Sequence, residues 1–218
     1  MSEAPTSRPL VADSDTIPKL LLRNAERFRN RPAFRLKDLG IWQTHTWSQV
    51  RDQIRDFAIG LHSIGVERGD TVAIVGDNLP RLYWTFTAAQ SLGAVPVPVY
   101  QDSVADEMAY VLDHAEIKVA VVENQEQVDK LLSISEEVPS LRDIVYSDPR
   151  GLKKYDHTHL HSYEDIQKLG AEQRRANAQL DDWWLGEIKA GKGSDTSVIL
   201  YTSGTTGRPK GVILTGEN

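Results

Sequence analysis

Cysteine is absent from this sequence of 218 residues. Its absence excludes disulfide bonds, thiolate nucleophiles and zinc sites built from thiolates, and it is the cysteine usage expected of a cytoplasmic protein. Basic residues are also in the minority, with 25 Lys and Arg against 31 Asp and Glu and a net charge of −6. Because a surface for nucleic acid requires a basic stripe or patch, we expect no nucleic-acid partner.

Long apolar segments are missing as well. The sequence starts with a polar, proline-containing stretch that has no apolar core of a signal peptide, so residues 1–15 are predicted to be a flexible leader. No apolar run approaches the ~20 residues that a membrane-spanning helix needs, which favours a soluble protein of the cytoplasm. The arginines of residues 23–35 are expected to form a solvated helix face, with peripheral contact to anionic lipid as the alternative.

Strand-like and helix-like segments alternate over most of the chain. After a first helical pattern, two alternating segments at 33–36 and 41–46 predict a β-hairpin. Thr46 and Gln49 have the spacing of a capping box at the start of the next helix, which Gly65 ends. Further strands are predicted at 71–75, 94–100, 117–122 and 143–146, with helices between them. Strands joined by helices form parallel βαβ units, so we expect an α/β fold with a mostly parallel sheet and helices on both of its faces.

Two segments depart from this regular pattern. Pro96 and Pro98 remove backbone donors from one predicted strand, which places that strand near an edge of the sheet or where a neighbour pairs with only one of its sides. Residues 147–195 are polar and interrupt the alternation, so they are predicted to form a long surface excursion of an α/β subdomain that covers residues 16–195. Within the excursion, the pair Trp183-Trp184 is expected to pack one of its two rings into the core.

A loop rich in glycine and hydroxyl residues joins the last two predicted strands, so residues 196–218 are interpreted as a strand, a phosphate-binding loop and a strand. Glycines let successive backbone N–H groups converge on an anion, and hydroxyls add donors for phosphate oxygens or a lone pair for Mg²⁺. Lys210 adds a point charge. The loop lacks the Gly-Lys-Ser/Thr order and the following helix of a Walker A motif, and it is too long for a two-residue hairpin turn. It is therefore predicted to bind a polyphosphate.

Residues 201–212, Tyr-Thr-Ser-Gly-Thr-Thr-Gly-Arg-Pro-Lys-Gly-Val, resemble the phosphate-loop motif of the adenylate-forming, AMP-binding enzymes. That superfamily includes acyl-CoA synthetases, luciferases and the adenylation domains of peptide synthetases. Residues 69–74 and 88–114 bear a weaker resemblance to the N-terminal part of bacterial long-chain fatty acid acyl-CoA synthetases. The fold that this resemblance implies is the first part of the large N-terminal domain of such an enzyme.

The resemblance implies a reaction in two steps. ATP and a fatty acid form an acyl-adenylate and pyrophosphate, and coenzyme A then takes the acyl group. The resemblance assigns the β- and γ-phosphates of ATP to Thr202, Ser203, Gly204, Thr205, Thr206, Gly207 and Lys210. It also implies that Thr202 is a ligand of Mg²⁺. No catalytic residue is expected within this chain, because the resemblance places the catalytic groups beyond Asn218.

Two departures from the family pattern affect this interpretation. The family has a histidine after the loop where this sequence has Gly216, so we expect an effect on substrate preference or rate. Family members also run to several hundred residues, whereas this chain has 218. We therefore expect the chain alone to be inactive. The alternative is a naturally short, non-catalytic module that binds polyphosphate or a protein partner.

Overall fold

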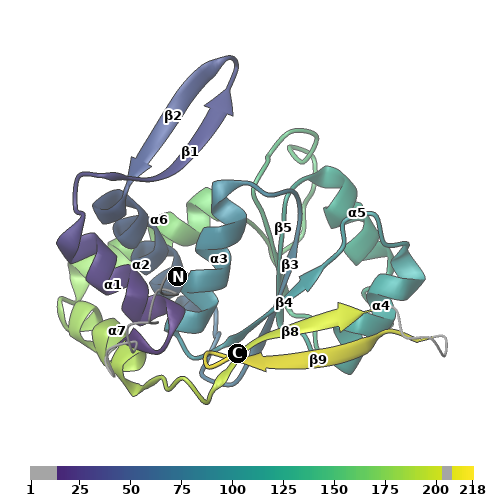
Figure 1. Ribbon diagram of the computed structural model, residues 1–218. Coiled ribbons are helices and arrows are strands. Elements are labelled where there is room, and N and C mark those ends of the chain that lie inside the picture. Colours follow the sequence, from purple (N-terminus) through teal and green to yellow (C-terminus); the bar gives the residue numbers. More distant parts are fainter. Residues whose placement is uncertain (1–13, 203–207) are drawn as a thin grey trace, which may run out of the picture.

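The computed structural model describes residues 14–202 and 208–218 (Figure 1). The predicted leader, apart from its last two residues, lies outside the described part. The helices are α1 (Ile17–Arg27), α2 (Trp47–Ser63), α3 (Pro80–Ser91), α4 (Ala105–His114), α5 (Gln125–Ser133), α6 (Tyr163–Ala176) and α7 (Gln179–Ala190). The strands are β1 (Pro32–Asp38), β2 (Ile41–Thr46), β3 (Thr71–Val75), β4 (Val95–Val99), β5 (Val119–Val122), β6 (Asp143–Tyr146), β7 (Leu160–Ser162), β8 (Thr196–Thr202) and β9 (Lys210–Thr215).

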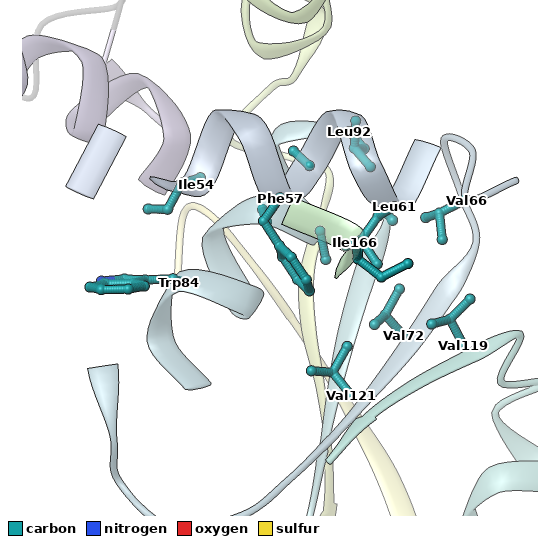
Figure 2. Close-up of a cluster of buried hydrophobic side chains, with 14 of the residues drawn as sticks. Ile54, Phe57, Leu61, Val66, Val72, Trp84, Leu92, Val119, Val121 and Ile166 are labelled. Carbon is teal, nitrogen blue, oxygen red and sulfur yellow. The ribbon is translucent and has the colours of Figure 1, made fainter. Parts of the chain in front are cut away.

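A five-stranded parallel sheet with the order β4-β3-β5-β6-β7 forms the centre of the molecule. The alternate residues of its strands enter two separate cores. Val72 of β3 and Val121 of β5 pack under α2, α3, α6 and α7, whereas Ala73 and Val122 face α4 and α5. Figure 2 shows the first of these cores, with Phe57 of α2 above the strands. The predicted α/β fold, with helices on both faces of a parallel sheet, is confirmed.

Local sequence signals place several of these elements correctly. The Thr46 hydroxyl accepts from the backbone N–H of Gln49 at 3.4 Å, and the Gln49 side chain accepts from the Thr46 N–H at 2.9 Å, which is the predicted capping box. Pro96 and Pro98 lie in β4, the edge strand of the parallel sheet, as predicted. The predicted hairpin is the antiparallel pair β1–β2, which projects from the body of the molecule (Figure 1).

The segment 147–195 differs from the predicted surface excursion. It contributes β7 to the parallel sheet and then forms α6 and α7, which cover one face of α2 and α3. The Tyr163 ring stacks on Phe57 with 3.9 Å between ring centroids. Trp184 is buried and donates its indole N–H to the Ser91 hydroxyl at 2.9 Å, which confirms that one ring of the tryptophan pair enters the core. A few apolar side chains at helical spacing thus attach a polar segment to the core.

The backbones of α2 and α6 approach each other at two glycines. A Cβ atom added at Gly170 of α6 would lie 1.8 Å from the Asp56 carbonyl oxygen, and one added at Gly60 of α2 would lie 2.0 Å from the Ile166 carbonyl oxygen. Neither position accepts a side chain unless the helices separate. The contact lets Tyr163 and Ile166 reach the first core.

We expect Gly170→Ala to destabilise the protein by about 1–3 kcal/mol, the usual cost of an overpacked interior, because the methyl group must push α6 away from α2. Gly186→Ala is the matched control, since nothing lies within 4 Å of a Cβ at that position of α7. The control should gain about 0.5–1 kcal/mol from the better helix propensity of alanine. Urea unfolding followed by circular dichroism measures both changes. Equal stability of the two variants would contradict the close helix contact.

Candidate functional site

The antiparallel pair β8–β9 flanks the predicted phosphate loop. Thr202 pairs with Lys210 at the last register position, and Tyr201 pairs with Gly211 next to it. The hairpin lies alongside β4 (Figure 1), and the side chains of Ile199 and Tyr201 pack on the second core, beneath α4. The edge strand β4 and the second core therefore fix the position of the hairpin end that carries the predicted loop.

Two of the predicted phosphate-binding residues lie in the described part of the chain. Thr202 and Lys210 are both exposed and stand opposite each other at the end of the hairpin, so the hydroxyl and the ammonium group are available to one ligand. The other five predicted residues, Ser203, Gly204, Thr205, Thr206 and Gly207, lie outside the described residues. Their predicted role stays a prediction.

Tyr201 connects the base of the loop to α4. Its hydroxyl shares a hydrogen bond of 2.6 Å with Nδ1 of His114, the last residue of α4, and the two rings meet edge to face. Burial, and to a smaller extent Tyr110, raise the pKa of the Tyr201 phenol, so the group stays protonated at neutral pH. Gly211 provides room for this ring, because a Cβ there would lie 3.3 Å from Tyr201 Cζ.

A hollow of about 660 Å³ lies beside the hairpin end. Its wall consists of the end of β4, the first turns of α4 and the hairpin, including Tyr100, Tyr110, Thr202 and Arg208. The guanidinium carbon of Arg208 is 5.2 Å from the centroid of the Tyr110 ring, so a cation–π contact holds this positive charge at the hollow. Arg208 places one cationic group at the hairpin side of the hollow, whereas Asp106 and Glu107 of α4 place two carboxylates in its lining.

Sequence reasoning did not select Arg208 or Tyr110. Arg208 could have been found, because it lies within the loop motif between Gly207 and Lys210 and carries a full charge. Tyr110 has no local signal, since only the packing of α4 against the hairpin brings its ring under Arg208.

Gly216 follows the hairpin at the position where the family pattern has a histidine. A Cβ at this glycine would lie 2.8 Å from the Asp15 carbonyl oxygen and 3.1 Å from the Gly193 carbonyl oxygen. Any side chain at this position would have to displace backbone atoms, so the local packing favours glycine where the family pattern has histidine.

Within residues 14–202 and 208–218, no group of three or more His, Asp or Glu side chains could hold a metal ion. This is compatible with the predicted role of Thr202, because that role relies on a hydroxyl and on the oxygens of a bound polyphosphate. In the same part of the chain, no helix has the length and apolar character that crossing a membrane requires.

Known proteins resemble this chain in sequence over most of its length. It is 36% identical over 207 residues to the long-chain-fatty-acid–CoA ligase ACSBG2 of Rattus norvegicus, which covers 93% of this chain and 29% of that protein. It is 32% identical over 182 residues to the long-chain-fatty-acid–CoA ligase FadD15 of Mycobacterium bovis, which covers 82% of this chain and 28% of that protein. The chain therefore spans less than a third of the length of these curated relatives.

Solved structures share the fold. The anthranilate CoA ligase AuaEII, in complex with anthranoyl-AMP, superimposes with a TM-score of 0.72 at 22% identity and covers 96% of this chain and 36% of its own. The luciferase-like enzyme of the mealworm Zophobas morio also gives a TM-score of 0.72, at 19% identity, covering 96% of this chain and 44% of its own. The family model described as "AMP-binding enzyme" matches residues 21–218, and the chain belongs to this family of adenylate-forming enzymes.

Proposed function

We propose that this chain is the N-terminal portion of an ATP-dependent long-chain fatty acid–CoA ligase. The observation that carries the proposal is the hairpin end, where exposed Thr202 and Lys210 face each other beside a hollow that Arg208 lines. Two relatives named long-chain-fatty-acid–CoA ligases, each matched over 93% of this chain, support a fatty acid as the substrate.

In the proposed first step, the carboxylate of the fatty acid attacks the α-phosphorus of ATP. The bond to the bridging oxygen breaks and pyrophosphate leaves with the electron pair, so negative charge grows on the leaving group. In this proposal, Lys210 and the Thr202 hydroxyl bind its phosphate oxygens, because donors that meet growing charge lower the barrier. The thiol of coenzyme A then takes the acyl group from the adenylate and releases AMP.

Mg²⁺ fits the same end of the hairpin, because the Thr202 hydroxyl is exposed and offers a lone pair beside the proposed position of the phosphates. When bound, the ion would share the charge of the phosphate oxygens. We also propose a cytoplasmic location, which the absence of cysteine supports.

His114 is a positioning residue in this proposal. It touches no substrate, but it holds Tyr201, the residue directly before Thr202, at 2.6 Å. Because the hydrogen bond joins the loop base to α4, it limits the positions that Thr202 can take. A short non-catalytic module that binds polyphosphate is the alternative, but the chain matches part of longer ligases, which does not favour it.

The complete gene product should catalyse exchange of pyrophosphate into ATP when long-chain fatty acids are present. Lys210→Ala should lower the exchange rate by about 10²-fold, the usual effect of removing one donor to developing charge. Lys189→Ala, which removes an exposed lysine at the end of α7, should leave the rate unchanged. Absence of exchange with every carboxylic acid tried would refute the ligase proposal, and equal rates for the two variants would refute the role of Lys210.

His114→Ala should raise the KM for ATP by about three- to tenfold, the equivalent of one lost hydrogen bond, with little change in protein stability. His114→Asn should recover part of the affinity, because its side-chain amide can still pair with the Tyr201 hydroxyl. Tyr83→Phe is the control, since Tyr83 is an exposed residue of α3 whose hydroxyl lies 3.3 Å from Asn78 Oδ1. An unchanged KM in His114→Ala would show that the contact with Tyr201 does not position the loop.

A further inference from the structure

The antiparallel pair β1–β2 ends in an exposed apolar tip. Leu39 is 95% exposed, Ile41 65% and Trp42 63%, although each has a large apolar side chain. The hairpin projects from the body of the molecule, so these side chains lie at its free end (Figure 1). Apolar side chains that gather at one exposed place mark an interaction surface, because their contact with water is unfavourable.

The turn at this tip is an unusual place for leucine. Asp38 and Ile41 are the last pair of the ladder, so Leu39 and Gly40 form the connection. Both have positive φ, 45° for Leu39 and 83° for Gly40, as a type I′ turn requires. Asn or Asp usually holds the first of these positions, because a short polar side chain tolerates the left-handed conformation better than others do. Leu39 is therefore unfavourable both in its backbone conformation and in its exposure, and the fold explains neither.

One face of the hairpin is turned toward the body of the molecule. Phe34 and His45 form a register pair, and both rings pack edge to face on Trp84 of α3, at 6.3 and 5.0 Å between centroids. Leu36 and Asp38 of the same face line a second hollow, of about 490 Å³, at the carboxyl ends of the parallel strands. The carboxylate closest to the tip is thus on this inner face.

The outer face of the hairpin carries positive charge. Side chains alternate along a strand, so Arg35 and Lys37 lie on the face opposite to Leu36. Trp42 pairs with Lys37 across the ladder and therefore lies on the outer face too. All three outer side chains are exposed. The outer face thus places an indole ring beside an ammonium group, close to the apolar tip.

Basic residues continue onto the segment that precedes the hairpin. Residues 23–44 contain six basic residues and two acidic ones, in a chain with a net charge of −6. The six basic residues are all exposed: Arg23, Arg27, Arg29, Arg31, Arg35 and Lys37. Within residues 14–202 and 208–218, none of the six forms an ion pair with a carboxylate. Their charge is therefore available to an anionic partner.

The arginines extend beyond the predicted helix face. α1 ends at Arg27, so Arg29, Arg31 and Arg35 follow the helix. The carbonyl oxygens of Arg29 and Arg31 accept from the first two N–H groups of α2 at 3.1 and 3.2 Å, which holds this loop at the base of the hairpin. The guanidinium carbons of Arg27 and Arg31 lie 5.2 and 5.5 Å from the centroid of the Phe28 ring. The positive charges therefore gather at the base of the hairpin and along its outer face.

A membrane surface fits this combination better than a protein or a nucleic acid does. A stable protein interface buries about 800 Å² on each partner, which the end of a two-stranded hairpin does not offer. Nucleic acid would meet the basic residues but would leave the apolar tip in water. An anionic bilayer accepts both, because apolar side chains enter below the headgroups, tryptophan favours that boundary, and basic side chains reach the lipid phosphates.

We propose that the tip of the β1–β2 hairpin inserts into an anionic lipid surface. Leu39, Ile41 and Trp42 reach the boundary between headgroups and acyl chains, roughly 5–10 Å deep. Arg35 and Lys37 stay at the level of the lipid phosphates. The insertion is shallow, because the backbone groups of the turn need polar partners that the headgroup region provides.

The test measures sedimentation of the complete gene product with vesicles, without ATP, fatty acid or coenzyme A. We expect binding to vesicles of phosphatidylcholine mixed with phosphatidylglycerol, and binding at least about tenfold weaker to phosphatidylcholine alone. Rising salt should weaken binding to the mixed vesicles. Absence of binding to the mixed vesicles would overturn the proposal. Polyglutamate that binds as tightly as these vesicles would also overturn it, in favour of an acidic protein partner. Because no substrate is used, the result is independent of the ligase assay.

Leu39→Asn separates insertion from folding, because asparagine suits the type I′ turn better than leucine does. The variant should bind mixed vesicles about tenfold more weakly, the loss of one inserted apolar side chain. Val104→Asn is the matched control, since Val104 is 61% exposed at the N-cap of α4, where asparagine is also favoured. Equal binding by the two variants would overturn the role of the tip, and it is the result expected if other parts of the complete protein cover the hairpin.

The double variant Arg35→Gln/Lys37→Gln should bind mixed vesicles about 25-fold more weakly at low salt, since each basic residue near an anionic surface contributes about fivefold. The difference from the parent should shrink at high salt. Lys189→Gln/Lys192→Gln is the control, because it removes two exposed lysines at and just after the end of α7, far from the hairpin tip (Figure 1). An equal loss in this control would show that net charge governs binding, and it would overturn the proposed surface.

Discussion

The parallel sheet must be covered on both faces, and the rest of the structure depends on this constraint. Its central strands β3 and β5 consist almost wholly of buried valine, alanine and isoleucine, so an uncovered face would expose a continuous apolar surface. The helices α4 and α5 cover one face, and α2, α3, α6 and α7 cover the other. Where a strand of the parallel sheet leads into a covering helix, the end of the strand and the start of the helix lie at the same rim of the sheet. Both hollows lie where such ends meet.

The elements that sequence reasoning placed correctly depend on short-range physics. The reciprocal bonds of Thr46 and Gln49 join residues three apart, and the prolines of β4 remove backbone donors wherever the strand lies. The loop motif could be recognised because its glycines, hydroxyls and lysine are consecutive. For these features the sequence contains both partners within one turn or one strand.

The features that the sequence did not reveal depend on distant partners. Residues 147–195 are polar on average, and the stacking of Tyr163 on Phe57 and the hydrogen bond from Gln167 to Gln53 show how they join the rest of the molecule. The contact of His114 with Tyr201 spans 87 positions. Such contacts require the tertiary structure.

The close fit of α6 against α2 also governs how the chain can assemble. Gln167 bonds to Gln53 across 114 positions, so the covering helix is synthesised long after the helix that it covers. At the usual ribosomal speed of about 5–20 residues per second, synthesis of these 114 residues takes about 6–23 s. During that time Phe57 has no Tyr163 to stack on, and the glycine faces of both helices cannot meet. The apolar surface of α2 therefore stays incomplete in the nascent chain until residues 163–176 of α6 have emerged.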